Sequence, residues 1–191
     1  MAHQLEDPRT AEHRESLRYT VMLKARDRDS ARSLSIMLQL GAEDRGHVHQ
    51  LDTYFALPGG RLKLREQEQE SELSYHAAGE EAAGSGSYRT AKVSDPVAVR
   101  GALAAKFGVL GVIEKSRRAL LWRDVRVRLD DVRGLGTFIS LAVSAPDSSQ
   151  VSGRAHVRGL REALAITDAQ LLLGSYCDRL LLTPEGRAPG R

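Results

Sequence analysis

Three cations alternate with two leucines in the segment Arg61-Leu62-Lys63-Leu64-Arg65. Side chains of a β-strand point alternately to its two faces, so the three cations share one face and the leucines share the other. Like charges on one face repel each other unless an anionic ligand or a set of carboxylates lies opposite them. The segment therefore predicts a strand that binds an anion.

The overall composition excludes several classes of partner. Lysines and arginines number 28 and acidic residues 25, which gives a formal net charge of +3. This excess is small for a nucleic-acid-binding protein, and the few aromatic residues offer no series of base-stacking positions. The single cysteine, Cys177, excludes an internal disulfide and a cysteine-rich zinc site. It is expected to be a small buried residue.

The apolar runs favour a cytoplasmic protein without a membrane partner. None approaches the roughly 18 residues that a spanning helix needs, and none resembles a signal peptide. The composition gives no prediction of the oligomeric state.

Apolar periodicity and turn residues divide the chain into strands and helices. Pro58-Gly59-Gly60 predicts a hairpin between two strands, and Asp95-Pro96 predicts a helix start. The predicted strands are 17–26, 47–56, 61–66, 72–76, 88–93, 111–116, 118–123 with 125–129, and 136–143. The predicted helices begin near 29, 95, 151 and 167 and end near 41, 108, 164 and 173, and residues 77–87 are expected to form a loose loop.

These elements predict one α+β domain over residues 17–183, with flexible tails at 1–16 and 184–191. About eight strands in hairpin-like order, charged on one face and apolar on the other, favour an antiparallel tunnel barrel with peripheral helices. The inside of such a barrel is polar and its outside is packed by helices. This is the reverse of a barrel with an apolar interior, and the polar interior predicts a ligand tunnel.

Five segments in order resemble the CYTH superfamily, the triphosphate tunnel metalloenzymes, and within it the class IV adenylyl cyclase branch. They are QLDTYF (50–55), GRLKLRE (60–66), VIEKSRR (112–118), LDDVRGLGTF (129–138) and SYCD (175–178). The resemblance implies an eight-stranded antiparallel β tunnel. It also implies that cations in the tunnel hold a polyphosphate and that carboxylates hold a divalent metal.

The sequence departs from the family pattern at the residues expected to bind metal. The family's first strand carries Glu-x-Glu-x-Lys, whereas this chain has Thr20 and Met22 before Lys24. The family's late strand carries Phe-x-Glu-x-Glu, whereas Ser140 and Ala142 stand here. Because Mg²⁺ and Mn²⁺ need hard oxygen ligands, the sequence predicts no bound metal and no cofactor. Metal-dependent cyclase or triphosphatase activity is then not expected.

The remaining cations predict the ligand site. Met22, Ala77, Ala78 and Ala142 make the predicted tunnel more apolar and roomier, which favours an anionic organic molecule over a bare triphosphate. The acids retained there are expected to be Asp52, Glu66, Glu114 and Asp130. The predicted ligand-binding residues are Lys24, Arg26, Arg61, Lys63, Arg65, Lys115, Arg117, Met22, Ser140, Ala142 and Tyr176.

Four residues are the catalytic candidates. Lys63, crowded by other cations, is a candidate base, and Tyr54 is a candidate hydrogen-bond donor. Asp52 and Glu114 are candidates for proton transfer. His47 and His49 share the opposite strand face from Asp52 and are expected at the surface. Tyr75 and His76 point to opposite faces, so at most one of them lines the tunnel.

Four functional interpretations remain open at this point. The favoured one is a metal-independent enzyme that performs a cyclisation, isomerisation or elimination on an anionic organic substrate. The second is a non-catalytic protein that binds nucleotides or polyphosphate. The third is an adenylyl cyclase or triphosphatase with its metal ligands at other positions. The fourth is an inert tunnel whose acids simply pair with the cations.

Overall fold

Alternating apolar and charged residues form the strands of one antiparallel sheet. In this computed structural model, residues 19–77, 89–144 and 150–183 are described. The strands are β1 (Tyr19–Arg26), β2 (Glu43–Leu57), β3 (Gly60–Glu66), β4 (Ser71–Ala77), β5 (Arg89–Val93), β6 (Gly111–Trp122), β7 (Val125–Val132) and β8 (Gly136–Ser144). The helices are α1 (Ser30–Gln39), α2 (Pro96–Phe107), α3 (Gln150–Ala163), the short 3₁₀ helix η4 (Asp168–Gln170) and α4 (Tyr176–Leu182).

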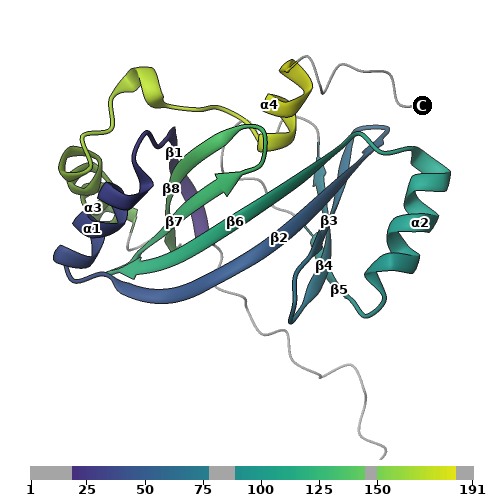
Figure 1. Cartoon of the computed structure of the whole chain (residues 1–191), viewed down its shortest axis with the longest axis horizontal. Coiled ribbons are helices and arrows are strands. Elements are labelled where there is room, and N and C mark those ends of the chain that lie inside the picture. Colours follow the sequence, from purple (N-terminus) through teal and green to yellow (C-terminus); the bar gives the residue numbers. More distant parts are fainter. Residues whose placement is uncertain (1–18, 78–88, 145–149, 184–191) are drawn as a thin grey trace, which may run out of the picture.

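The eight strands lie in the order β1-β8-β7-β6-β2-β3-β4-β5, and every neighbouring pair is antiparallel. The sheet curves strongly along its long β2 and β6 strands, so that β1, β8 and β7 lie at one side and β3, β4 and β5 at the other (Figure 1). Within the described ranges no ladder pairs β5 with β1, so hydrogen bonds leave the barrel open between these strands. The predicted α+β fold with an eight-stranded antiparallel sheet is confirmed.

The main apolar core lies on the outside of the curved sheet, under α1 and α3. Val125, Val127 and Leu141 are fully buried there, together with Met37 of α1 and Leu160 of α3. Residues between these apolar positions, such as Arg126 and Arg128, share the other face by strand alternation. The inside of the sheet is therefore polar and the outside is packed by helices, as the alternation predicted.

Local sequence signals set the helix starts and one close contact. Asp29 and Asp95 cap α1 and α2 by accepting backbone N–H bonds, and Pro96 begins α2. Gly153 lets α3 approach β8, because a Cβ atom there would lie 2.4 Å from Val143 Cγ1. Ser175 and Asp178 form a capping box at the start of α4.

The structure corrects several predicted element boundaries. Strand β2 begins at Glu43, and β6 runs unbroken over Gly111–Trp122. The predicted helix at 167–173 is wrong: η4 is one short turn, and Leu171 forms an isolated bridge with Ala25 before α4 begins. The predicted tails at 1–16 and 184–191 lie outside the described residues, as does the predicted loop except for Ala77, which ends β4.

No helix in the described part of the chain combines the length and apolar character that a membrane crossing requires.

Candidate functional site

The inner face, which we define as the side of the sheet opposite the α1/α3 core, gathers charged side chains from many strands. Cross-strand pairing places Asp52 opposite Arg65, Lys63 opposite Tyr54, and Arg117 opposite Asp130. The ionisable residues on this face include Lys24, Arg26, Asp52, Arg61, Lys63, Arg65, Glu72, His76, Lys115, Arg117, Arg126, Arg128 and Asp130. Cations thus outnumber carboxylates along the inner face.

Asp52 on β2 is the centre of the first charge cluster and is only 1% exposed. The Nε and Nη2 atoms of Arg65 donate to its two carboxylate oxygens at 2.7 and 2.9 Å. The buried Lys115 ammonium donates to Oδ2 of the same carboxylate. Both oxygens of Asp52 are therefore bound by cations from β3 and β6.

These contacts set the protonation of the first cluster. Burial alone would raise the pKa of Asp52, but Arg65, Lys115 and Lys63 outweigh it and hold that pKa well below its usual range. Burial, with the charges of Arg65 and Arg117, lowers the pKa of Lys115 to about 7, although Asp52 opposes this shift. Lys115 is thus a buried amine that titrates near neutral pH.

Asp130 on β7 is the centre of a second cluster and is also 1% exposed. Arg117 donates to its two oxygens from Nε at 2.6 Å and from Nη2 at 2.7 Å. The Tyr176 hydroxyl donates to Oδ2 at 2.8 Å, and burial followed by the Asp130 charge raises the pKa of Tyr176. In both clusters, an arginine on one strand and an aspartate on the neighbouring strand thus form a bidentate ion pair.

The segment that leads into α4 crosses the inner face and engages further cations. Lys24 Nζ donates to the Gly174 carbonyl at 2.8 Å and lies 4.9 Å from the centre of the Tyr176 ring. Arg61 Nη2 donates to Asp178 Oδ1 at 2.9 Å. Since Tyr176 contacts β7 and Asp178 contacts β3, α4 bridges the two sides of the curved sheet (Figure 1).

Arg128 on β7 differs from the arginines of the two clusters. Its cross-strand neighbour on β8 is Ser140, and Ser140 in turn lies opposite Lys24 on β1. No ion pair or hydrogen bond joins the Arg128 guanidinium to another described residue. Burial, with the charges of the nearby Arg117, Arg126 and Arg65, lowers the pKa of Arg128 to about 9, and Asp130 opposes this shift.

Comparison with known proteins identifies the family. The model of the CYTH domain matches residues 18–169, which is most of the chain. The chain belongs to the CYTH domain family. No curated protein gives a significant match.

Solved structures share the CYTH fold at low sequence identity. A protein of Pyrococcus horikoshii OT3 is 21% identical, with a TM-score of 0.73 over 84% of this chain and 98% of that one. A candidate adenylate cyclase of Vibrio parahaemolyticus is 17% identical, with a TM-score of 0.68 over 83% and 95% of the two chains. A candidate adenylyl cyclase of Hippeastrum with a dominant triphosphatase activity is 16% identical, with a TM-score of 0.56 over 75% and 87%.

The inner face of this CYTH domain does not fit the divalent metal that the resemblance implies. Asp52 and Asp130 direct their oxygens to arginine, lysine and tyrosine. Ser140 and Ala142 offer no carboxylate and lie opposite Arg128 and Arg126. Among the side chains that the structure describes, no group of three or more His, Cys, Asp or Glu residues could hold a metal ion.

Two predicted tunnel acids lie outside the tunnel. Glu114 is on the outer side of β6, where it bonds His49 at 3.2 Å and Arg133 at 2.7 Å. Glu66 bonds Arg100 of α2 at 2.8 Å. Both expected placements are wrong. The side chains of Lys115 and Arg65 point to the inner face, so the adjacent Glu114 and Glu66 point to the outer face. The predicted outward position of His49 agrees with this arrangement.

Most of the other predicted site residues share the inner face. Lys63 lies between Tyr54 and Ser74, and Tyr54 is buried in the apolar cluster beside Tyr176. Arg26 donates to the Leu135 carbonyl at 3.1 Å at the rim. Of Met22 only the backbone is described, and a register shift between Val21 and Leu23 places Val21, rather than Met22, opposite Ala142. The pairing of β1 with β8 is therefore irregular at this point.

Sequence reasoning missed Arg126, Arg128 and Asp178, and it left open which of Tyr75 and His76 lines the tunnel. The two arginines alternate with Val125, Val127 and Leu129 in the same way as Arg61 and Lys63 alternate with leucines, so the signal was present in the sequence. His76 is 8% exposed, and its Nε2 lies 3.0 Å from Ser74 Oγ on the inner face. Burial, then Lys63, Arg61 and Arg65, lower the pKa of His76 to about 4.

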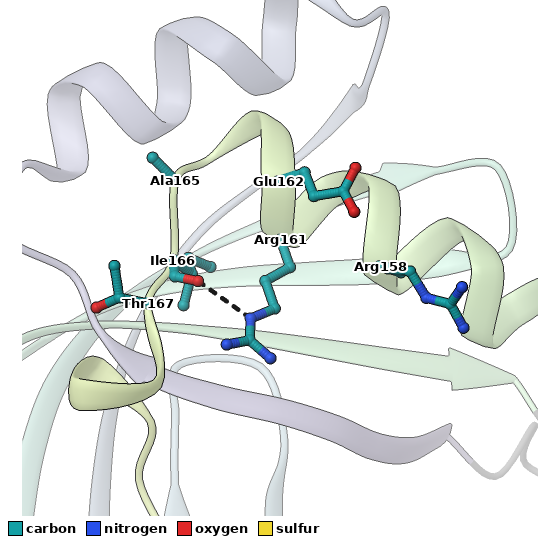
Figure 2. A pocket seen from close by; sticks show the side chains of 6 residues that line it. All are labelled: Arg158, Arg161, Glu162, Ala165, Ile166 and Thr167. Carbon is teal, nitrogen blue, oxygen red and sulfur yellow. Dashed lines mark hydrogen bonds between the residues drawn. The ribbon is translucent and has the colours of Figure 1, made fainter.

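A separate surface hollow of about 410 Å³ lies at the end of α3, away from these clusters (Figure 2). Its lining residues are Arg158, Arg161, Glu162, Ala165, Ile166 and Thr167. Arg161 Nε donates to the Ile166 carbonyl at 3.0 Å, and its Nη2 donates to Asp168. This arginine closes the α3 terminus onto the following segment, which is a structural role.

Proposed function

We propose that this CYTH domain binds an anionic organic small molecule on its inner face without a divalent metal. The supporting observation is the charge arrangement: the buried carboxylates Asp52 and Asp130 are already bound by cations, and further cations remain on the same face. Buried or half-buried cations in excess carry a desolvation cost that an anionic ligand offsets. The partner is then a small anion rather than a nucleic acid or a membrane, and the proposed location is the cytoplasm.

An organic molecule suits the face better than a bare polyphosphate. Phe138 and Tyr176 pack in a tilted arrangement with ring centres 4.9 Å apart beside the Asp130 cluster, and Tyr54 and Ile113 belong to the same apolar group. Ala142 adds an apolar position on β8. Mixed apolar and cationic walls are typical of sites for small organic ligands.

We further propose that the domain is an enzyme, because ionisable groups suited to proton transfer lie on the inner face. Lys115, with a pKa of about 7, is the candidate group for moving a proton at neutral pH, and the predicted catalytic residue Asp52, which stays ionised, binds and orients it. The other candidates, Lys63 and Tyr54, are cross-strand neighbours on the adjoining ladder. A metal-independent cyclisation, isomerisation or elimination would use these groups; otherwise the domain is a binding protein for nucleotides or polyphosphate.

A thermal-shift panel in EDTA tests the proposal. Citrate, ATP and tripolyphosphate are each added to the wild type, to Lys63→Gln on the inner face, and to Arg118→Gln on the outer side of β6. We expect at least one anion to raise the Tm of the wild type and of Arg118→Gln, and to raise that of Lys63→Gln less. Equal shifts in the two variants, or no shift in the wild type with any anion, would contradict binding on the inner face.

A further inference from the structure

Two arginines of the inner face share the same cross-strand pairing. Arg65 lies opposite Asp52 on the β3–β2 ladder, and Arg117 lies opposite Asp130 on the β6–β7 ladder. In both pairs the arginine uses Nε and Nη2 to bind both oxygens of one carboxylate. Two inner-face arginines of this chain are thus paired with a carboxylate from the neighbouring strand.

Arg128 breaks the pattern, because the residue opposite it is a serine. Ser140 is in direct register with Arg128 on the β7–β8 ladder, and its side chain is one short hydroxyl where the other two pairs have a carboxylate. Neither the Arg128 guanidinium nor the Ser140 hydroxyl has a hydrogen-bond partner among the described residues. Asp130, two residues along the strand, already binds Arg117 and Tyr176.

The surroundings of this pair are cationic. Lys24 lies opposite Ser140 on β1, and Arg126 lies opposite Ala142 two positions along the β7–β8 ladder. Arg117 and Arg126 repel the charge of Arg128 and, after burial, are the main causes of the lowered pKa of Arg128. A single additional negative charge opposite Arg128 would relieve this repulsion.

We propose that a carboxylate of the bound ligand occupies the position opposite Arg128, beside Ser140 and Lys24, and gives Arg128 the kind of carboxylate partner that Arg65 and Arg117 have. The ligand is therefore an organic acid. A planar carboxylate matches the guanidinium fork as Asp52 and Asp130 do, and the serine hydroxyl and the lysine supply further donors. This inference rests on the proposed function and specifies its ligand class and binding residues.

The test compares acetate with inorganic phosphate by NMR of the arginine Nε–H groups, in EDTA. We expect acetate to shift the Arg128 resonance of the wild type, and inorganic phosphate to bind at least tenfold more weakly. Ser140→Asp supplies the missing carboxylate inside the chain, so it should abolish the acetate response and raise the Tm of the ligand-free protein. Ser35→Asp, at an exposed position of α1, is the matched control and should change neither.

The outcomes separate this inference from the proposed function. In a thermal-shift titration with citrate, Arg128→Gln should weaken binding at least tenfold while Arg118→Gln leaves it unchanged. Unchanged acetate binding in Ser140→Asp, unchanged citrate binding in Arg128→Gln, or a wild type that prefers phosphate would overturn the carboxylate site alone. A wild type that responds to no anion would overturn the proposed function as well.

Discussion

At the residue scale, Asp52 holds the inner face together by balancing two buried cations. Asp52→Asn removes the charge that faces Arg65 and Lys115, both of which remain largely out of water. Leaving buried charges unpaired costs roughly 3 kcal/mol, so we expect the free energy of unfolding in urea at pH 7 to fall by about that amount. Glu114→Gln, which breaks solvent-exposed bonds on the outer face, should remain close to wild type. Equal losses in the two variants would show that the Asp52 cluster contributes no special stability.

His76 gives the fold a specific sensitivity to acid. The pKa of His76 is about 4 in the folded chain and about 6.5 when unfolded, so between these values only the unfolded state takes up the proton. Stability is therefore lost as the pH falls from 6.5 to 4, by about 2 to 3 kcal/mol from this residue. Urea unfolding at pH 7 and pH 4 should show a smaller loss in His76→Asn than in the wild type. The same pH dependence in both proteins would rule out this assignment.

At the element scale, α4 is fixed to the sheet by one buried hydroxyl. Tyr176→Phe removes the bond to Asp130 and leaves one side of that carboxylate without a donor. We expect a loss of about 1 to 2 kcal/mol in unfolding free energy and faster amide exchange across α4. Tyr75→Phe, whose hydroxyl bonds the Gly59 carbonyl near solvent, is the control. Similar exchange rates in the two variants would mean that α4 is held by its apolar contacts alone.

The faces of the sheet could be predicted from strand alternation, whereas contacts between residues distant in the sequence could not. Arg61-Leu62-Lys63-Leu64-Arg65 revealed both faces of β3, and the same period placed Asp52, Tyr54 and Lys115 correctly. The position of α4 depends on Tyr176 meeting Asp130 and on Asp178 meeting Arg61, which are contacts across more than forty residues. The bulge in β1 is likewise a property of its pairing with β8, which residue spacing alone could not predict.

At the scale of the whole molecule, the curved sheet separates two kinds of chemistry. Its outer face contacts α1 and α3 through apolar residues, and its inner face holds arginine–carboxylate pairs and further cations. Because the inner-face carboxylates are bound within the chain, the domain has cations to offer a ligand but lacks a described carboxylate cluster for a metal. The central claim is therefore anion binding that needs no divalent metal.

The measurement that tests this claim most directly is calorimetric titration of the best anion from the thermal-shift panel, in EDTA and again in Mn²⁺. We predict binding in EDTA with an affinity that Mn²⁺ does not increase, and a weaker affinity at higher salt because the contacts are ionic. Binding that appears only with Mn²⁺ would contradict the account and would restore a metal-dependent cyclase or triphosphatase as the function to pursue.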